Sequence, residues 1–336
     1  MKNKEIKKHF LPGKVSRGRK GNGGGPLGMG RWGFMASELA QFVYAAVTAL
    51  VILFTWTGLE DPQTLLWQRM TFLSGTIVLW VAYWLWPCRF VILCRVTYLL
   101  FILGSWYPDT YDINSQFGCL DHLFADYEQR LFGMQPALWF SRIFNGKVVS
   151  ELMYAGYFSY YFFFVVILVY LYFRDYGQLE RASYIIFGSF FVCYSIYLAL
   201  PVVGPQYYYL AVGTDEIAKG SFPDVGTYFA HSTDALKAPG WDGGLFYNLM
   251  TLIHNSGERP TAAFPSSHVA IATLVMMMAA RLRAWRYFLC LALPYVFLCL
   301  STVYIMAHYA IDVIAGLAFG VALFFLFGGM RLHKVA

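Results

Sequence analysis

The chain has 336 residues, of which 58% are hydrophobic and only 13% are charged. An average soluble domain is about half apolar and about a quarter charged, so this composition excludes an ordinary soluble domain and indicates that lipid surrounds most of the chain. The formal net charge is +6, but the basic residues lie between apolar segments, where they act as topology signals. We therefore expect no binding of nucleic acid.

The first 33 residues have the composition of a basic tail. Nine of them are Lys or Arg, and the run from Gly21 to Gly30 is mostly glycine. Such a composition cannot bury enough apolar surface to offset the entropy of ordering the chain. We expect residues 1–33 to be a disordered cytoplasmic tail and residues 34–336 to form one membrane domain.

Eight apolar segments follow the tail, each long enough to cross a hydrocarbon core of about 30 Å as a helix. We place them at about 37–57, 67–86, 89–106, 151–173, 182–201, 266–282, 286–305 and 308–329. The predicted fold is an all-α polytopic membrane protein with about eight transmembrane helices.

Lys and Arg are distributed unevenly over the segments that separate these spans. With the tail in the cytoplasm, eighteen basic residues fall on the cytoplasmic face and seven on the other. Because cytoplasmic segments carry the excess of basic residues, we expect both termini in the cytoplasm and the loops 107–150 and 202–265 on the extracytoplasmic face. The first loop mixes large apolar and charged residues, which predicts helices lying in the membrane interface.

Three ionisable residues lie at the outward ends of the predicted spans, where polar groups are costly and therefore point to function. His308 and Asp312 are four residues apart, on one face of a helix. A carboxylate there can accept the imidazole N–H, which fixes the tautomer and leaves the other ring nitrogen free to attack phosphorus and form a phosphohistidine. His268, at the start of an earlier span, is the candidate general acid.

The residues before His268 are suited to hold a phosphate group. Pro265, Ser266 and Ser267 are typical of a helix start, whose backbone N–H groups attract anions. The guanidinium of Arg259 could bind phosphate oxygens through two hydrogen bonds; the alternative is a surface arginine in an ion pair or against lipid headgroups. No cluster of carboxylates suited to Mg²⁺ lies beside the histidines in the sequence, so we expect no metal and no cofactor.

Two motifs resemble those of a known family. Residues 265–268 (PSSH) are similar to the PSGH-type motif of the type 2 phosphatidic acid phosphatase superfamily, and residues 301–312 (STVYIMAHYAID) to its S-R-x5-H-x3-D motif. The resemblance implies a six-helix membrane core. It also implies that His308 is the nucleophile, Asp312 the orienting acid and His268 the general acid.

Two departures from the family pattern narrow the expected function. Thr302 occupies the position of the arginine, and Arg259-Pro260 is only half of the family's K-x6-R-P motif, with Leu252 at the lysine position. The segments AFPSSH, STVYIMAHYAID and LPVVGPQY most resemble the inositol phosphorylceramide synthase branch. That resemblance implies a phosphotransferase of sphingolipid metabolism.

Three functions stay open from the sequence. The resemblance favours transfer of a phosphoryl headgroup between lipids, with a hydroxyl acceptor discharging the phosphohistidine. With water in that place, the protein would be a phosphatase of phosphatidate, phosphatidylglycerophosphate or a polyprenyl diphosphate. A non-catalytic membrane transporter or scaffold is the third alternative. In both enzymatic cases the partners are the membrane and a lipid phosphate, and the site is expected on the extracytoplasmic face.

Overall fold

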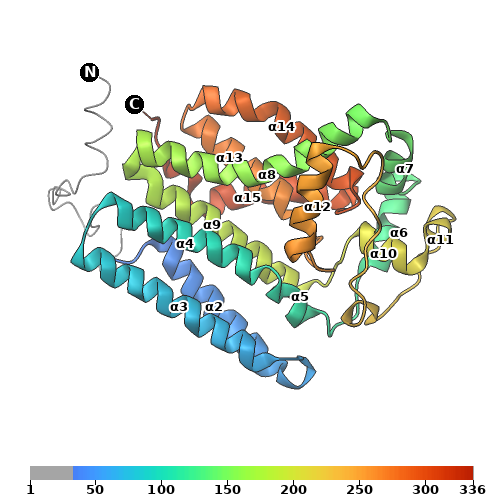
Figure 1. The fold of residues 1–336 in the computed structure, drawn as a ribbon, viewed down its shortest axis with the longest axis horizontal. Coiled ribbons are helices and arrows are strands. Elements are labelled where there is room, and N and C mark those ends of the chain that lie inside the picture. Colours follow the sequence, from blue (N-terminus) through green and yellow to red (C-terminus); the bar gives the residue numbers. More distant parts are fainter. Residues whose placement is uncertain (1–32, 336) are drawn as a thin grey trace.

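The computed structural model describes residues 33–335, without the side chains of residues 253–256. The predicted basic tail therefore lies, but for its last residue, outside the described part of the chain. Within the described residues the secondary structure is helical, with no strand (Figure 1). The all-α prediction is confirmed.

All eight predicted spans are helices. They are α2 (Ala36–Phe54), α3 (Pro62–Leu85), α4 (Arg89–Trp106), α8 (Lys147–Arg174), α9 (Tyr176–Ala199), α13 (Ser267–Arg281), α14 (Trp285–Tyr304) and α15 (Ala310–Leu326). Six of them are long and apolar enough to cross a membrane, whereas α13 and α15 are shorter apolar helices of 15 and 17 residues. This pattern is that of an integral membrane protein.

Local capping explains where two of these helices begin. The side chain of Asp61 accepts a hydrogen bond from the backbone N–H of Thr64 at 3.0 Å, and Pro62 occupies the first turn of α3, where a missing N–H costs nothing. The hydroxyl of Ser266 accepts from the backbone N–H of Val269 at 3.4 Å and caps α13. The helix start expected from the PSSH segment is therefore present.

Short helices fill the two long loops. They are α5 (Asp109–Asn114), α6 (Asp121–Phe132) and α7 (Pro136–Ile143) in the first loop, and α10 (Pro205–Val212), α11 (Thr214–Ala218), η2 (Tyr228–Ala230) and α12 (Leu245–Gly257) in the second; the 3-10 turns η1 (Trp56–Gly58) and η3 (Gly329–Arg331) complete the chain. Both loops gather at the right-hand end of the bundle in Figure 1. At the other end, Arg181 and Arg281 donate to carbonyls of the C-terminal segment. Both loops predicted to face one side of the membrane thus share one end of the molecule.

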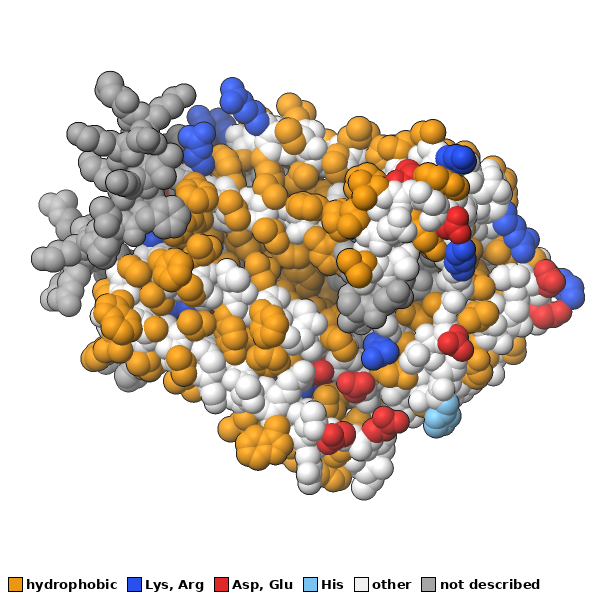
Figure 2. All heavy atoms as spheres, in the orientation of Figure 1, with side chains coloured by type: hydrophobic (Ala, Val, Ile, Leu, Met, Phe, Trp, Pro, Cys, Tyr) orange, Lys and Arg blue, Asp and Glu red, His pale blue; other side chains and the backbone are white. Residues whose placement is uncertain are grey.

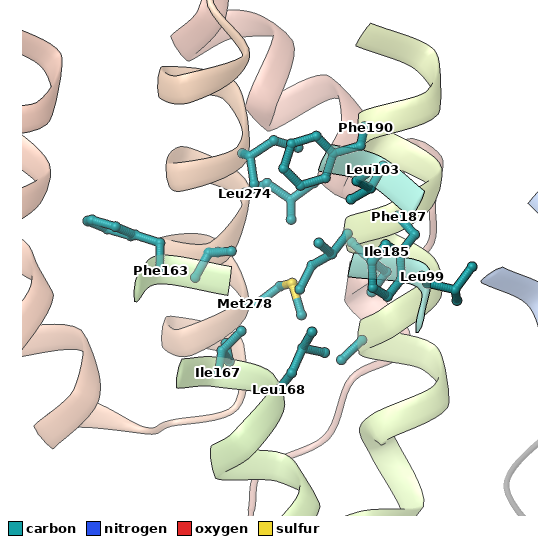
Figure 3. Packing of buried hydrophobic residues seen from close by; sticks show 14 of the residues in the cluster. Leu99, Leu103, Phe163, Ile167, Leu168, Ile185, Phe187, Phe190, Leu274 and Met278 are labelled. Carbon is teal, nitrogen blue, oxygen red and sulfur yellow. The ribbon is translucent and has the colours of Figure 1, made fainter. Parts of the chain in front are cut away.

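The buried core surrounds α13, which contacts α8, α9, α14 and α15. Figure 3 shows Leu274 and Met278 of α13 facing the apolar side chains of α8 and α9, with Leu103 of α4 close by. In contrast, α3 lies at the periphery and buries few of its side chains. The centre of the bundle is therefore α13, the helix that begins at the predicted general acid.

Helices α13 and α15 approach closely because α15 presents two glycines to α13. A Cβ atom at Gly316 would lie 2.7 Å from the carbonyl oxygen of Ser266, and one at Gly320 would lie 2.4 Å from that of Ala270. Glycines four residues apart allow such close contact between helices in membranes. This contact places the start of α13 beside the start of α15, where the predicted catalytic residues lie.

Candidate active site

His268 and His308 meet where α13 and α15 begin. Nε2 of His308 lies 3.3 Å from Nδ1 of His268, and the ring centroids are 5.4 Å apart. His308 is buried, whereas His268 is partly exposed. The fold therefore brings together two side chains that are 40 residues apart in the sequence.

A backbone carbonyl determines which nitrogen of His308 carries the proton. Nδ1 of His308 lies 2.7 Å from the carbonyl oxygen of Ala263. Because a carbonyl oxygen only accepts, Nδ1 is the protonated nitrogen. In a neutral ring Nε2 is then the unprotonated nitrogen, and it faces His268. This is the tautomer that an attack through Nε2 requires.

Asp312 lies beside His308 without being its closest acceptor. Its Oδ2 is 3.7 Å from Nδ1 of His308, which is too long for a hydrogen bond, and it accepts instead from the backbone N–H of Tyr309 at 2.8 Å. The hydrogen bond that the i, i+4 spacing led us to expect is thus made to Ala263. Asp312 is fully buried, so an ionised carboxylate there would interact strongly with any positive charge on the nearby ring.

Two residues that flank this arrangement have backbone conformations in the left-handed region. The φ angles are 68° at Ala262 and 63° at Met306, and a residue with a Cβ pays about 1–2 kcal/mol there. Ala262 immediately precedes the carbonyl that binds His308, and the carbonyl of Met306 accepts from the backbone N–H of Gln206 at 2.7 Å. Strain of this kind clusters at functional sites.

The two serines of the PSSH segment already bond to the protein. The hydroxyl of Ser266 caps α13 through Val269, and the backbone N–H of Ser267 donates to the hydroxyl of Tyr197 at 3.1 Å. Two of the N–H groups expected to cradle a phosphate therefore have protein partners. Phosphate binding by Ser266 and Ser267 stays a prediction.

A cavity of about 480 Å³ reaches His268. The imidazole lies between Tyr157 and Tyr160 of α8, with ring centroids 4.8 Å and 4.3 Å away. Apolar and aromatic side chains form most of the cavity wall, and Glu258 and Ser267 lie beside His268 on its lining. Figure 2 shows a recess with hydrophobic walls on this face, in the region where Figure 1 has α4 below and α8 above.

Arg259 does not line that cavity. It is exposed and lies on a second cavity of about 390 Å³, together with Gln206 and Asp234. Glu258 lines both cavities and accepts a hydrogen bond from the hydroxyl of Tyr157 at 2.8 Å. Binding of a phosphate group by Arg259 also stays a prediction.

A sequence model of the PAP2 superfamily matches residues 123–326, which is more than half of the chain. The chain belongs to the PAP2 superfamily. Members of this superfamily are phosphatases or phosphotransferases, and the protein is an enzyme of this kind, which argues against the transporter or scaffold. The matched residues include both histidines and Asp312, whereas α2 to α5 lie outside the match. No curated protein and no solved structure matches the chain.

In this PAP2 superfamily enzyme, Thr302 occupies the position of the motif's arginine. The side chain is fully buried, and its hydroxyl donates to the carbonyl of Cys299 in the preceding turn at 3.0 Å. Its own carbonyl accepts from the backbone N–H of His308 at 3.0 Å. Thr302 therefore contacts the backbone of His308 and supplies no cation.

Two carboxylates of α6 that the sequence analysis did not single out lie against the segments next to His308. Asp121 accepts from the backbone N–H of Gly204 at 2.9 Å and from the hydroxyl of Tyr309 at 3.1 Å. Glu128 accepts from the backbone N–H of Ala310 at 2.6 Å, at the first turn of α15. The only signal in the sequence is their spacing of seven residues, which places two acids on one face of a helix.

Both of these carboxyl groups are buried. Burial raises the pKa of Asp121 to about 7 and that of Glu128 to about 8, and the negative charge of Asp312 acts in the same direction. In the described residues, Oε2 of Glu128 has no hydrogen-bond partner. Burial thus makes both carboxyl groups of α6 harder to ionise than exposed acids.

Proposed function

We propose that the protein is a membrane lipid phosphotransferase that works through a phosphohistidine on His308. The observation that supports this most directly is the pair of imidazoles, with an unprotonated Nε2 of His308 3.3 Å from Nδ1 of His268. One nitrogen can attack phosphorus while the other serves the leaving oxygen of the same phosphoryl group. The buried charge of Asp312 offsets the positive charge that forms on the attacking ring.

The reaction divides into two displacements. Nε2 of His308 attacks phosphorus, the bond from phosphorus to the leaving alkoxide breaks, and protonated His268 gives that alkoxide a proton. Neutral His268 then takes the proton of an acceptor hydroxyl, whose oxygen attacks phosphorus as the phosphorus–nitrogen bond breaks. With water as the acceptor, the same steps hydrolyse the intermediate.

The cavity that reaches His268 favours a lipid over a soluble phosphoester, because most of its wall is apolar. The resemblance of residues 263–268 and 301–312 to the inositol phosphorylceramide synthase branch favours a hydroxyl-bearing lipid as the acceptor. We therefore propose transfer of an inositol phosphate headgroup between lipids. Both termini would be cytoplasmic and the site would face the extracytoplasmic side.

A transfer assay tests this proposal. Purified protein in vesicles is given phosphatidylinositol labelled in its phosphate, with and without ceramide. Transfer predicts a labelled sphingolipid that appears only with ceramide, and hydrolysis predicts a water-soluble inositol phosphate in both cases. The absence of any product from phosphatidylinositol, phosphatidate or a polyprenyl diphosphate would contradict the proposed function.

A pair of histidine variants completes this assay. His308→Ala should abolish product formation because it removes the attacking nitrogen. His231→Ala is the matched control, since His231 is exposed and lies in the second loop. Equal activity of the two variants would contradict the assignment of the nucleophile.

Sidedness is tested separately by labelling single cysteines in a cysteine-free background. The two variants are Lys219→Cys, at a position in the second loop, and Arg283→Cys, at a position in the short connection between α13 and α14. In right-side-out vesicles, a membrane-impermeant maleimide should label the former and not the latter. The opposite pattern would place the site in the cytoplasm.

A further inference from the structure

Helix α4 forms one side of the cavity that reaches His268. The cavity volume of about 480 Å³ lies within the range of pockets that hold small organic ligands. The cavity is lined by Leu100, Leu103 and Gly104 of α4 and by Tyr107, directly after its end. Because Tyr107 lies seven positions after Leu100 and keeps a helical backbone conformation, this wall extends about 10 Å along the axis of α4. It is long enough to follow a chain-like ligand.

The lining changes in polarity along the cavity. Glu258 and Ser267 accompany His268, whereas α8 and α9 contribute aromatic and apolar side chains such as Phe164 and Phe190. A molecule with a phosphorylated head and a hydrocarbon tail has the same distribution of polarity. Its head would lie at the histidines and its tail between α4, α8 and α9.

We propose that α4 forms the wall of a hydrocarbon-chain site that begins at His268, and that Gly104 sets the width available to the chain. This inference rests on the proposed function, because it assigns the tail of the lipid whose head reacts at His308. It goes further because it assigns selection of the lipid's hydrocarbon chain to α4, a helix outside the residues that match the PAP2 superfamily.

The α4 wall is firmly attached to the matched helices. The hydroxyl of Tyr194 on α9 donates to the carbonyl of Leu103 at 3.1 Å. Trp106 is fully buried, and the centroids of its ring and the ring of Phe191 on α9 are 6.1 Å apart. A wall fixed in this way gives the cavity a defined width.

Gly104 differs from the glycines that allow close helix packing. A Cβ at Gly156 or Gly316 would lie 2.7 Å from a backbone atom of a neighbouring helix, whereas a Cβ at Gly104 would meet nothing within 4 Å. Glycine inside a helix costs about 1 kcal/mol relative to alanine, and helix packing gives no reason for it here. The open space in front of Gly104 belongs to the cavity, so the absent side chain leaves that space to a ligand.

A substitution series at Gly104 tests the proposal with phosphatidylinositol carrying either dioctanoyl or dioleoyl chains. Gly104→Trp should lower kcat/KM for the dioleoyl lipid by about tenfold or more, because a bulky side chain then occupies part of the site. Activity on the dioctanoyl lipid should change little. Gly104→Ala should retain both activities, since its Cβ has free space.

Phe90→Trp is the matched control, because Phe90 is an exposed residue of the same helix outside this cavity. It should leave the ratio of the two activities at the wild-type value. If Gly104→Trp lowers both activities equally, or neither, the proposal is overturned. If the wild-type protein has no activity on either lipid, that result would instead contradict the proposed function.

Photocrosslinking supplies a readout that needs no turnover. A dioleoyl-length phosphatidic acid with a diazirine in its acyl chain is bound to the wild-type protein, irradiated, and the adducts are located by mass spectrometry. We expect adducts within residues 100–107 that disappear in Gly104→Trp and persist in Phe90→Trp. Adducts confined to the periphery, such as α3, would overturn the proposal even if the enzyme were active.

Discussion

The region where α13 and α15 begin and the N-terminal helices α2 to α4 are stabilised by different interactions. At the start of α13 and α15, glycines such as Gly316 let two backbones touch, and the polar side chains bond to backbone groups. The N-terminal helices expose many side chains and are held by buried ion pairs. Arg95 of α4 pairs with Glu38 of α2, and Arg69 of α3 pairs at 2.9 Å with Asp109 of α5, the helix that follows.

This difference reflects what each region has to do. Chemistry at phosphorus requires reacting atoms to be fixed within a fraction of an ångström, and contact between backbones achieves this. A wall for a lipid chain requires a defined shape but no reactive group. The N-terminal helices can therefore tolerate changes at their surface that the start of α15 cannot.

The largest effect on activity is expected from Asp312→Asn. An elementary charge about 4 Å away contributes about 4 kcal/mol at an effective dielectric constant of about 20, so loss of the carboxylate should lower kcat by about a thousandfold. The tautomer should survive, because Ala263 holds Nδ1 of His308. The measurement is the initial rate of headgroup transfer in vesicles.

The control for this variant is a second carboxylate at the same distance from an imidazole. Asp224 is exposed and lies 3.7 Å from Nδ1 of the partly buried His122, and Asp224→Asn should retain activity. A drop of less than about tenfold in Asp312→Asn would argue against an electrostatic role at the site.

The next effect concerns stability in the N-terminal region. Glu38→Gln leaves the buried Arg95 without its charged partner, which costs about 3 kcal/mol, so Tm in detergent should fall clearly. The rate per folded molecule on dioctanoyl substrate should stay near the wild-type value. Glu216→Gln, in the exposed pair with Lys219, is the control and should not change Tm. If Glu38→Gln lowers the rate strongly and leaves Tm unchanged, the N-terminal ion pair serves activity rather than stability, contrary to this prediction.

Two glycine variants sharpen the comparison directly. Gly316→Ala should destabilise the protein by about 1–3 kcal/mol, because the new methyl group meets the backbone of α13. Gly104→Ala should stabilise it by up to about 1 kcal/mol through helix propensity. Chemical unfolding in mixed micelles measures both changes. The two changes in the free energy of unfolding are expected to have opposite signs. Equal changes would show that packing around Gly316 is not tighter than around Gly104.

The smallest effect is a pH dependence of stability that comes from α6. Burial raises the pKa of Glu128 from 4.5 to about 8, so the folded state binds the proton more tightly than the unfolded state. The contribution of Glu128 to the free energy of unfolding is fully present below its ordinary pKa and is lost as the pH rises toward 8. Asp121, whose pKa is raised to about 7, acts in the same direction.

Thermal unfolding at about pH 5 and about pH 8 checks this prediction. Wild-type Tm should fall by about 3 °C or more between them. Glu128→Gln keeps an oxygen for the backbone N–H of Ala310 and should reduce that fall, and the double variant with Asp121→Asn should reduce it further. An unchanged slope in both variants would show that these carboxyls titrate normally.

The positions of the helices were predictable from apolar segments, and all eight appear as helices, although α13 and α15 are shorter than the other six. The residues of the histidine pair were predictable from their motifs, and the structure brings them together. The acceptor for Nδ1 of His308 was predicted wrongly, because the carbonyl of Ala263 is a backbone group that no side-chain pattern encodes. The contact of α6 with Gly204 and Ala310 was missed for the same reason, since its carboxylates bind backbone N–H groups far away in the sequence.

The most direct test of the central claim is to trap the covalent intermediate. Purified enzyme is mixed with phosphatidylinositol in the absence of ceramide, quenched in alkali within the first turnover, digested and analysed by mass spectrometry. We predict an inositol phosphoryl group on His308, absent from His308→Ala and retained in His231→Ala. An active enzyme with no adduct under these conditions, or with the adduct on another residue, would contradict the mechanism.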